Sequence, residues 1–90
     1  MHEVQMKVYG NVQGVGLRYS TREKPRQLSL TGWVKNEPDG SVIILAQGDK
    51  ENLEKLVQWI NTTPMLAQVE KVETNWQNPG EIFTNFEIRY

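Results

Sequence analysis

A β-hairpin is predicted by two apolar-rich runs, Thr31-Gly32-Trp33-Val34-Lys35-Asn36 and Ser41-Val42-Ile43-Ile44-Leu45-Ala46-Gln47. The four residues between them, Glu37-Pro38-Asp39-Gly40, have the composition of a tight turn. Pro38 fixes the backbone angle φ at the first turn position, and Gly40 can adopt the left-handed conformation that a three-residue connection needs. The centre of the chain is therefore expected to be an antiparallel pair of strands.

Further elements are predicted on both sides of this hairpin. Residues 3–8 alternate polar and apolar side chains, which is the period of a strand with one buried face. Residues 17–29 have a helical composition. Residues 50–61 form the most secure helix, which Pro64 ends and whose apolar residues follow the i, i+3, i+4, i+7 spacing: Leu53, Leu56, Val57 and Ile60. Two late strands are predicted by alternating positions, Val72, Thr74 and Trp76 in one and Phe86, Ile88 and Tyr90 in the other.

This order of elements predicts the fold class. It is β-α-β-β-α-β with one additional strand, the split βαβ pattern of ferredoxin-like α+β sandwiches. We expect a mixed sheet of about five strands with two helices on one face. The pattern does not give the position of the fifth strand in the sheet.

The first helix contains a difficulty. Ser20-Thr21-Arg22-Glu23 has the form of a capping box, which marks a helix start. If the helix begins there, Pro25 lies past the free first turn, where it removes a hydrogen bond at a cost of ~3 kcal/mol. The helix is therefore expected either to kink at Pro25 or to begin later than the capping box indicates.

The composition limits the class of protein. Ninety residues, 38% of them hydrophobic, suffice for one domain spanning 1–90 but not for a multidomain enzyme. The absence of cysteine excludes a disulfide scaffold, a thiolate nucleophile, a Cys-ligated zinc site and an iron–sulfur cluster. A net charge of −1 and a pI near 5.8, without a Lys/Arg-rich run, argue against a nucleic-acid partner. The absence of an aromatic strand motif likewise argues against an RNA-binding sheet.

The sequence also lacks the signals of export and membrane insertion. Residues 1–8 alternate in polarity and do not resemble a signal peptide. No run approaches the roughly 18 consecutive apolar residues of a membrane span. We therefore expect a cytoplasmic protein, a monomer with no membrane partner.

A glycine-rich segment between the first strand and the first helix is the leading candidate for a binding site. It runs Gly10-Asn11-Val12-Gln13-Gly14-Val15-Gly16-Leu17-Arg18, with three glycines in its first seven residues. Backbone N–H groups converging near a helix N-terminus bind phosphate, and the Arg18 guanidinium would add forked donors. Alternatively, the glycines only make a tight connection and Arg18 lies on the surface. The spacing fits neither G-x-x-x-x-G-K-[ST] nor G-x-G-x-x-G, so nucleotide motifs are absent.

Three blocks of the sequence together resemble the acylphosphatase family. They are Gly10 to Tyr19, Leu30 to Asn36, and Pro38-Asp39-Gly40-Ser41-Val42, and the similarity covers essentially the whole chain. The resemblance implies a small ferredoxin-like enzyme that hydrolyses the carboxyl–phosphate bond of acyl phosphates without metal or cofactor. It implies that Arg18 and the loop amides bind the phosphoryl group and that Asn36 positions the attacking water. The phosphate-binding residues implied are Asn11, Val12, Gln13, Gly14, Val15, Gly16, Leu17 and Arg18.

The implied chemistry is physically coherent. A carboxylate is a good leaving group, so the enzyme mainly has to position the reactants and stabilise phosphoryl charge, and inorganic phosphate is the second product. Asn36 ends the second strand of a split βαβ, on the same side as the loop after the first strand. Its amide can accept from water and donate to phosphate, although Asn36 alone could also be a turn residue before Pro38. The alternative function is a non-catalytic phosphate- or carboxylate-binding regulatory module on the same fold.

The sequence departs from the family pattern at several positions. Asn11 replaces a common arginine and Leu17 a usual phenylalanine, which affects charge near the loop and packing beneath Arg18. Ser29 replaces a frequent glycine, and Pro25 interrupts the first helix; these two departures are expected to affect stability and loop placement more than chemistry.

The remaining candidate residues are expected to be structural. His2, the single histidine, is expected to be a surface residue rather than a ligand or base. Glu37 and Asp39 are expected to be turn residues, not a carboxylate pair. The three tryptophans are expected to pack on the core or sheet rather than stack bases: Trp33, Trp59 and Trp76.

Overall fold

The structure, a computed structural model, describes residues 1–10, 17–62 and 69–89. In this part of the chain the element order is the predicted one, β-α-β-β-α-β followed by one more strand. The elements are β1 (His2–Gly10), α1 (Leu17–Gln27), β2 (Thr31–Asn36), β3 (Val42–Gly48), α2 (Lys50–Thr62), β4 (Val69–Gln77) and β5 (Phe86–Arg89). The expectation for residues 64 and 90 lies outside the described residues.

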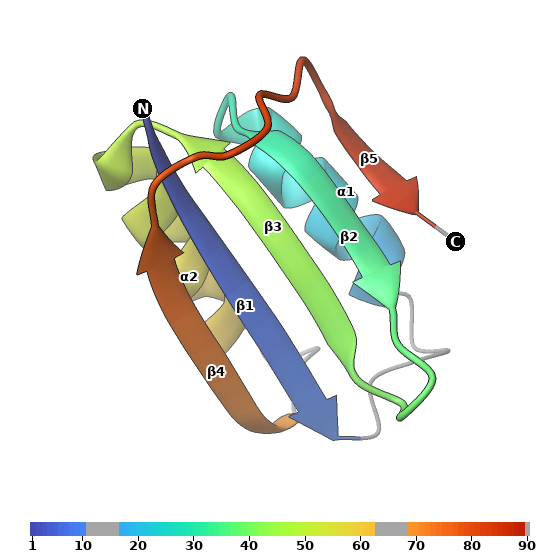
Figure 1. The fold of residues 1–90 in the computed structure, drawn as a ribbon. Helices are drawn as coiled ribbons and strands as arrows, with labels where there is room; N and C mark the ends of the chain where they lie inside the picture. The colour runs from blue at the N-terminus through green and yellow to red at the C-terminus, as the bar shows by residue number, and fades with distance from the viewer. Residues whose placement is uncertain (11–16, 63–68, 90) are drawn as a thin grey trace.

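The described strands form one mixed sheet in the order β4-β1-β3-β2-β5. β1 is antiparallel to β3 and β4, and β2 is antiparallel to β3 and parallel to β5. The structure thus places the fifth strand at the edge beside β2, a position that the sequence left open. Because β1 and β2 are both antiparallel to β3, they run in the same direction and end at the same edge of the sheet (Figure 1).

Both helices cover the same face of the sheet (Figure 1), as predicted, and the core lies between the two layers. Alternate residues of β1 and β3 face α2, because successive side chains of a strand point to opposite faces. Leu53, Leu56 and Ile60 of α2 are at most 1% exposed, whereas Val57 packs at the margin of the core. The core residues are Val4, Met6, Val8, Leu30, Val34, Val42, Ile44, Ala46, Leu53, Leu56, Ile60 and Phe86.

The tryptophans follow the prediction of packing only in part. Trp59 packs against the core from α2, and Trp33 is half-buried on the helix-free face of the sheet. Trp76 remains 44% exposed, because β4 is an edge strand and its neighbour on one side is solvent. None of the helices in the described ranges has the length and hydropathy needed to traverse a bilayer.

α1 does not begin later than the capping box, which was one of the two predicted alternatives; the other alternative, a kink at Pro25, stays a prediction. The helix begins at Leu17, before the Ser20–Glu23 box, so reading that box as the helix start was wrong. Pro25 therefore falls in the last turn, two residues before the helix ends at Gln27. Pro25 has no N–H to donate to the carbonyl of residue 21, so the hydrogen bond missing for this reason lies outside the first turn of α1.

The C-terminus of α1 is closed by a Schellman motif. Leu30 N–H donates to the Pro25 carbonyl oxygen at 2.9 Å, and Ser29 N–H donates to Arg26 at 3.1 Å. This motif requires a left-handed residue between helix and strand, and Ser29 occupies it with φ 58°. A glycine, which the family resemblance implies at this position, would fit this conformation, because glycine has no Cβ to clash there.

Replacing Ser29 with glycine is expected to raise the free energy of unfolding by about 1 kcal/mol, because the left-handed strain of a side-chain-bearing residue is removed. Urea denaturation followed by circular dichroism measures the change. Ser29→Ala is the matched control, since it keeps the Cβ and should bring no gain. Equal stability of the glycine and alanine variants would contradict the strain.

Candidate active site

Three chain segments that are separate in sequence meet at one edge of the sheet. β1 ends there at Gly10, β2 ends there at Asn36, and the beginning of α1 lies beside the end of β2 (Figure 1). The juxtaposition follows from topology, because β1 and β2 are parallel to each other on either side of β3. This edge is the predicted location of the site.

The structure describes the positions of three of the predicted site residues, Leu17, Arg18 and Asn36. Asn11, Val12, Gln13, Gly14, Val15 and Gly16 lie outside the described residues. Leu17 and Arg18 are described as the first two residues of α1, and their place in the fold is thus at the edge where Asn36 ends β2. Their roles, and that of Asn36, stay predictions.

Asn36 has an unusual polar environment. It is the last residue of β2 and pairs with Val42 of β3. By strand alternation its side chain shares the helix-covered face with Val34, which is fully buried. Its Oδ1 atom is buried and accepts no hydrogen bond from the described residues. Buried polar atoms are nearly always paired, so an unpaired amide oxygen at this edge marks a place where water or a ligand can donate.

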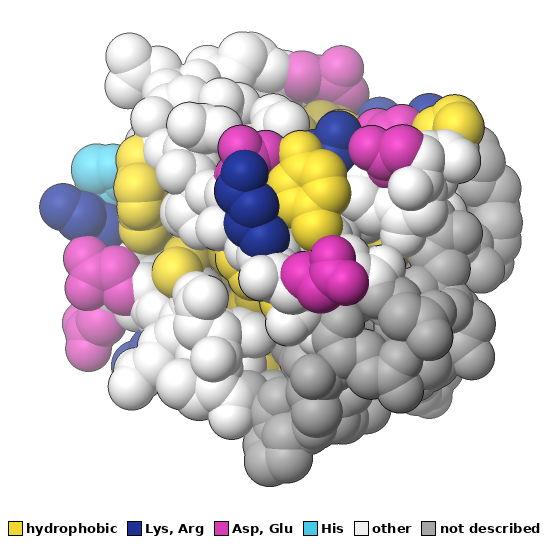
Figure 2. Space-filling model, turned by 90° about the horizontal axis from the view of Figure 1, so that it is seen from below, with side chains coloured by type: hydrophobic (Ala, Val, Ile, Leu, Met, Phe, Trp, Pro, Cys, Tyr) yellow, Lys and Arg dark blue, Asp and Glu magenta, His cyan; other side chains and the backbone are white. Residues whose placement is uncertain are grey.

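Local charge at this edge suits an anion. The first turn of α1, at this edge, carries no acidic residue that would offset the positive end of the helix dipole, whereas Lys24 and Arg26 lie in the last turn, at the opposite end of the helix. Figure 2 looks onto the molecule from this edge and shows basic and acidic side chains side by side around an apolar one on the described surface. The described surface at this edge thus carries both signs of charge, and the N-terminus of α1 is the local feature that favours an anion there.

The turn after Asn36 is held by a network of hydrogen bonds. Glu37 N–H donates to the Ser41 carbonyl oxygen at 2.8 Å, and Gly40 N–H donates to the Glu37 carbonyl oxygen at 3.1 Å. Gly40 has φ 92°, the left-handed conformation predicted for it. Asp39 Oδ1 accepts from Ser41 N–H at 2.9 Å and from Ser41 Oγ at 2.5 Å. Asp39 is thus a turn residue, as predicted.

Asp39 has a second partner that the sequence did not reveal. Lys7 Nζ, on β1, lies 3.3 Å from Asp39 Oδ2. The hydrogen bonds from Ser41, and then the Lys7 ammonium, lower the pKa of Asp39 to about 2. The hydrogen bond to Asp39 in turn raises the pKa of Lys7. Both groups are therefore ionised at neutral pH.

The lowered pKa predicts a specific acid sensitivity. In the unfolded chain Asp39 has an ordinary pKa of 3.8, above its value of about 2 in the folded protein, so its carboxylate stabilises the fold above pH 4. This contribution is lost as the pH falls from 4 towards 2. Asp39→Asn keeps an acceptor for Ser41 but does not titrate, so the stability difference between wild type and variant should shrink over that interval in urea unfolding. A constant difference from pH 6 to pH 2 would contradict the assignment.

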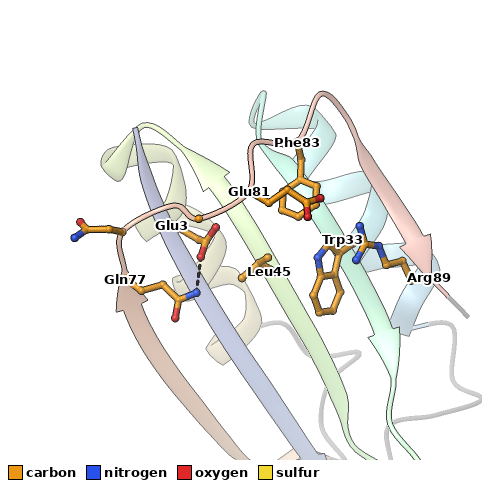
Figure 3. Close-up of a pocket in the computed structure, with 9 residues that line it drawn as sticks. Glu3, Trp33, Leu45, Gln77, Glu81, Phe83 and Arg89 are labelled. Atoms are coloured by element: carbon orange, nitrogen blue, oxygen red, sulfur yellow. Dashed lines mark hydrogen bonds between the residues drawn. The ribbon is translucent and has the colours of Figure 1, made fainter.

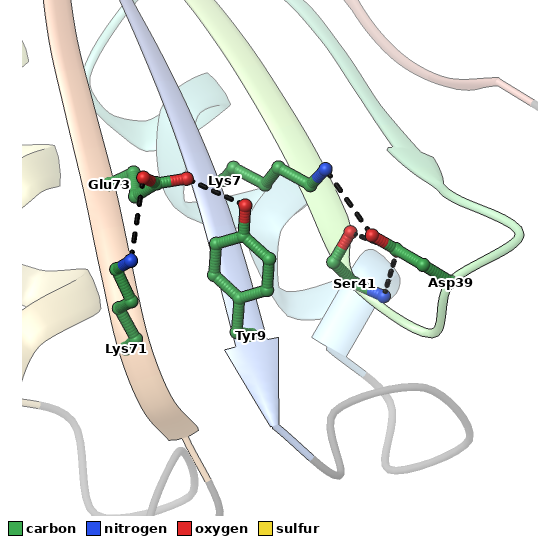
Figure 4. Close-up of polar contacts among 6 residues, drawn as sticks. All are labelled: Lys7, Tyr9, Asp39, Ser41, Lys71 and Glu73. Atoms are coloured by element: carbon green, nitrogen blue, oxygen red, sulfur yellow. Dashed lines mark hydrogen bonds and ion pairs between the residues drawn. The ribbon is translucent and has the colours of Figure 1, made fainter.

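Lys7 and Asp39 belong to a row of polar contacts that continues across β1 to β4 (Figure 4). Lys7 Nζ lies 5.2 Å from the centre of the Tyr9 ring, and Tyr9 Oη donates to Glu73 Oε1 at 2.6 Å. Lys71 Nζ lies 3.5 Å from Glu73 Oε2. We call these five residues, Asp39, Lys7, Tyr9, Glu73 and Lys71, the polar chain. The sequence analysis did not predict the polar chain. The composition around Asp39 indicated only a turn, and Lys7 was one of several polar residues in a strand of alternating polarity.

A separate cleft of about 390 Å³ lies on the helix-free face, under the segment that joins β4 to β5 (Figure 3). Glu3, at its floor, is 4% exposed, and both of its carboxylate oxygens accept hydrogen bonds: Oε1 from Gln47 at 2.7 Å and Oε2 from Gln77. Gln47 also donates to the Glu81 carbonyl oxygen. Asn36, the predicted site residue whose side chain the structure describes, does not line this cleft, and the buried polar groups of the cleft hold the β4–β5 connection in place.

Comparison with known proteins gives the class of the enzyme. The family model described as Acylphosphatase matches residues 4–88, nearly the whole chain. The chain belongs to the acylphosphatase family. The protein is accordingly an acylphosphatase, an enzyme whose substrate is a small-molecule acyl phosphate.

Individual acylphosphatases agree with this assignment. A curated acylphosphatase of Salinibacter ruber is 42% identical over 86 residues, which are 96% of this chain and 90% of that protein. One from Acaryochloris marina is 47% identical over 81 residues, which are 90% and 86% of the two chains. The crystal structure of acylphosphatase from Bacillus subtilis has a TM-score of 0.90 at 35% identity, and the match covers 100% of both chains. The resemblance and the ferredoxin-like α+β fold expected from the sequence are thus confirmed, and the enzyme is favoured over the non-catalytic module.

Proposed function

We propose that this acylphosphatase hydrolyses acyl phosphates by direct in-line attack of water on phosphorus. The new P–O bond forms to the water oxygen, the P–O bond to the acyl oxygen breaks, and its electron pair leaves with the carboxylate. Both protons of the water stay on the phosphate product, which forms as H2PO4−. Arg18 and the backbone amides of residues 11–17 hold the phosphoryl oxygens, and Asn36 orients the water. No metal or cofactor takes part.

The unpaired Oδ1 of Asn36 is the observation that carries this proposal. The atom is buried and accepts no hydrogen bond from the described part of the chain, at the edge where α1 begins. A water that donates to Oδ1 is fixed in direction without giving up its proton, because an amide oxygen is an acceptor and not a base. Positioning of this kind can supply much of the rate when the leaving group is good.

The residue types at the site support a single displacement. Residues 10–18 contain no Ser, Thr, Cys, His, Asp or Glu, so no nucleophile for a phosphoryl-enzyme intermediate is at hand in that segment. A guanidinium and backbone N–H groups instead stabilise the charge that spreads over the three equatorial oxygens in the transition state. The reaction therefore rests on placement and electrostatics.

The activity and its point of attack are tested together with benzoyl phosphate in the presence of a chelator. The purified protein should convert it to benzoate and inorganic phosphate at an undiminished rate. In water enriched in oxygen-18, the label should enter phosphate and not benzoate. Label in benzoate would show attack at the carbonyl carbon, and loss of activity on chelation would overturn the metal-free mechanism.

A further inference from the structure

We infer that Lys7 and Asp39 are positioning residues, which set the placement of Asn36 relative to the end of β1 through an ion pair across the sheet. This inference rests on the function proposed above. Neither side chain is part of the phosphate-binding segment or of the water-orienting group. They act on the reaction through the backbone of the turn and of β1.

The turn side of this connection is rigidly built. Asn36 is followed immediately by the turn, and Asp39 Oδ1 takes both hydrogen bonds from Ser41, which is 2% exposed. The other carboxylate oxygen, Oδ2, is directed to Lys7 at 3.3 Å (Figure 4). A movement of the Asp39 carboxylate therefore moves the turn, and with it the end of β2 that carries Asn36.

The other side of the connection leads to the phosphate-binding segment. Lys7 lies on β1, which ends at Gly10, directly before residues 11–16. Its ammonium is held between Asp39 and the Tyr9 ring, and Tyr9 in turn donates to Glu73 of β4. The polar chain thus joins the last residues of β1 to the turn after β2, passing over β3. Backbone pairing alone links these two strands only indirectly, because β3 lies between them.

The consequence for catalysis concerns kcat rather than substrate affinity. The phosphoryl group is held by Arg18 and the amides, so its binding does not require Asn36 to be exactly placed. The in-line attack does require it, and a displacement near 1 Å can cost as much as ~10²-fold in rate. The ion pair is partly exposed, with side-chain accessibilities of 31% and 52%, so its contribution to overall stability is small and a catalytic effect is distinguishable from unfolding.

Two single variants and their combination test the inference with benzoyl phosphate. Lys7→Met removes the ammonium, and Asp39→Asn removes the charge while keeping an acceptor for Ser41. Each should lower kcat ~5-fold, with KM and inhibition by inorganic phosphate within ~2-fold of wild type. The double variant should also lose ~5-fold, not ~25-fold, because both changes break the same contact. In 1 M NaCl the Debye length is ~3 Å, so the salt weakens the attraction between Lys7 and Asp39. The kcat of wild type should therefore fall towards that of the variants, whereas the kcat of the variants should hardly change.

Matched controls separate this effect from a change of net charge. Lys55→Met and Glu54→Gln make the same charge changes on exposed positions of α2, on the opposite face of the sheet, and should leave kcat unchanged. Unchanged kcat in both Lys7→Met and Asp39→Asn, or strictly multiplicative losses, would overturn the inference while the proposed function stands. A folded wild-type protein that does not hydrolyse benzoyl phosphate would overturn both.

Discussion

Replacement of Arg18 by alanine is expected to lower kcat/KM for benzoyl phosphate by roughly 10³-fold, the scale of a guanidinium that stabilises phosphoryl-transfer charge. The proposed mechanism gives this side chain the permanent positive charge at the mouth of the phosphate-binding segment. Its forked donors match two phosphoryl oxygens, and these bonds strengthen as charge develops in the transition state. Inorganic phosphate should correspondingly inhibit the variant far less than it inhibits wild type.

Two further variants make the Arg18 result specific. Arg18→Lys keeps the charge but loses the forked geometry, so its activity should lie between wild type and alanine. Lys24→Ala removes a positive charge from the opposite end of the same helix and should leave turnover nearly unchanged. Normal kinetics for Arg18→Ala would remove this residue from the mechanism, provided that circular dichroism shows a folded protein.

Replacement of Asn36 by alanine is expected to separate binding from turnover. The variant should bind inorganic phosphate within ~3-fold of wild type, because the phosphoryl ligands remain. Its kcat should fall by roughly 10²- to 10³-fold, the range found when one preorganised hydrogen-bonding group is removed from an active site. The variant also removes a buried, unpaired oxygen, so its thermal stability should be equal to or above that of wild type.

The stability readout distinguishes Asn36 from a simple turn residue. If Asn36 served only the turn before Pro38, its loss would lower stability and leave kcat close to wild type. Asn75→Ala, at an exposed position of β4, is the matched asparagine control and should change neither property. An Asn36→Ala protein that no longer binds phosphate would show that this residue holds the phosphoryl group instead of the water.

The elements that local pattern predicted best are those with clear periodicity or turn chemistry. β2 was predicted at its observed bounds, Thr31–Asn36, and α2 to within one residue of its end at Thr62. Gly40 was predicted to adopt the left-handed backbone conformation, and its φ of 92° confirms this. These features depend on residues close together in sequence, so the side-chain pattern carries the information.

The prediction of where α1 starts was wrong, because the capping-box pattern competed with the helical composition of the residues before it. The Ser20–Glu23 box has the composition of a helix start, but the helix already begins at Leu17. Pro25 lies in the last turn, and the Schellman motif at Ser29 and Leu30 closes the helix behind it. A short motif indicates a cap only where the chain on its N-terminal side is not itself helical.

The sequence by itself determined the family, the residue types available for chemistry, and the order of strands and helices along the chain. These follow from composition, periodicity and short motifs. Only the tertiary structure decided that β5 lies beside β2, that Asn36 keeps an unpaired buried oxygen, and that Lys7 meets Asp39. Each of these facts depends on strands that are distant in sequence and on their register. Pairing of that kind is settled when the whole sheet closes its core, and no local pattern encodes it.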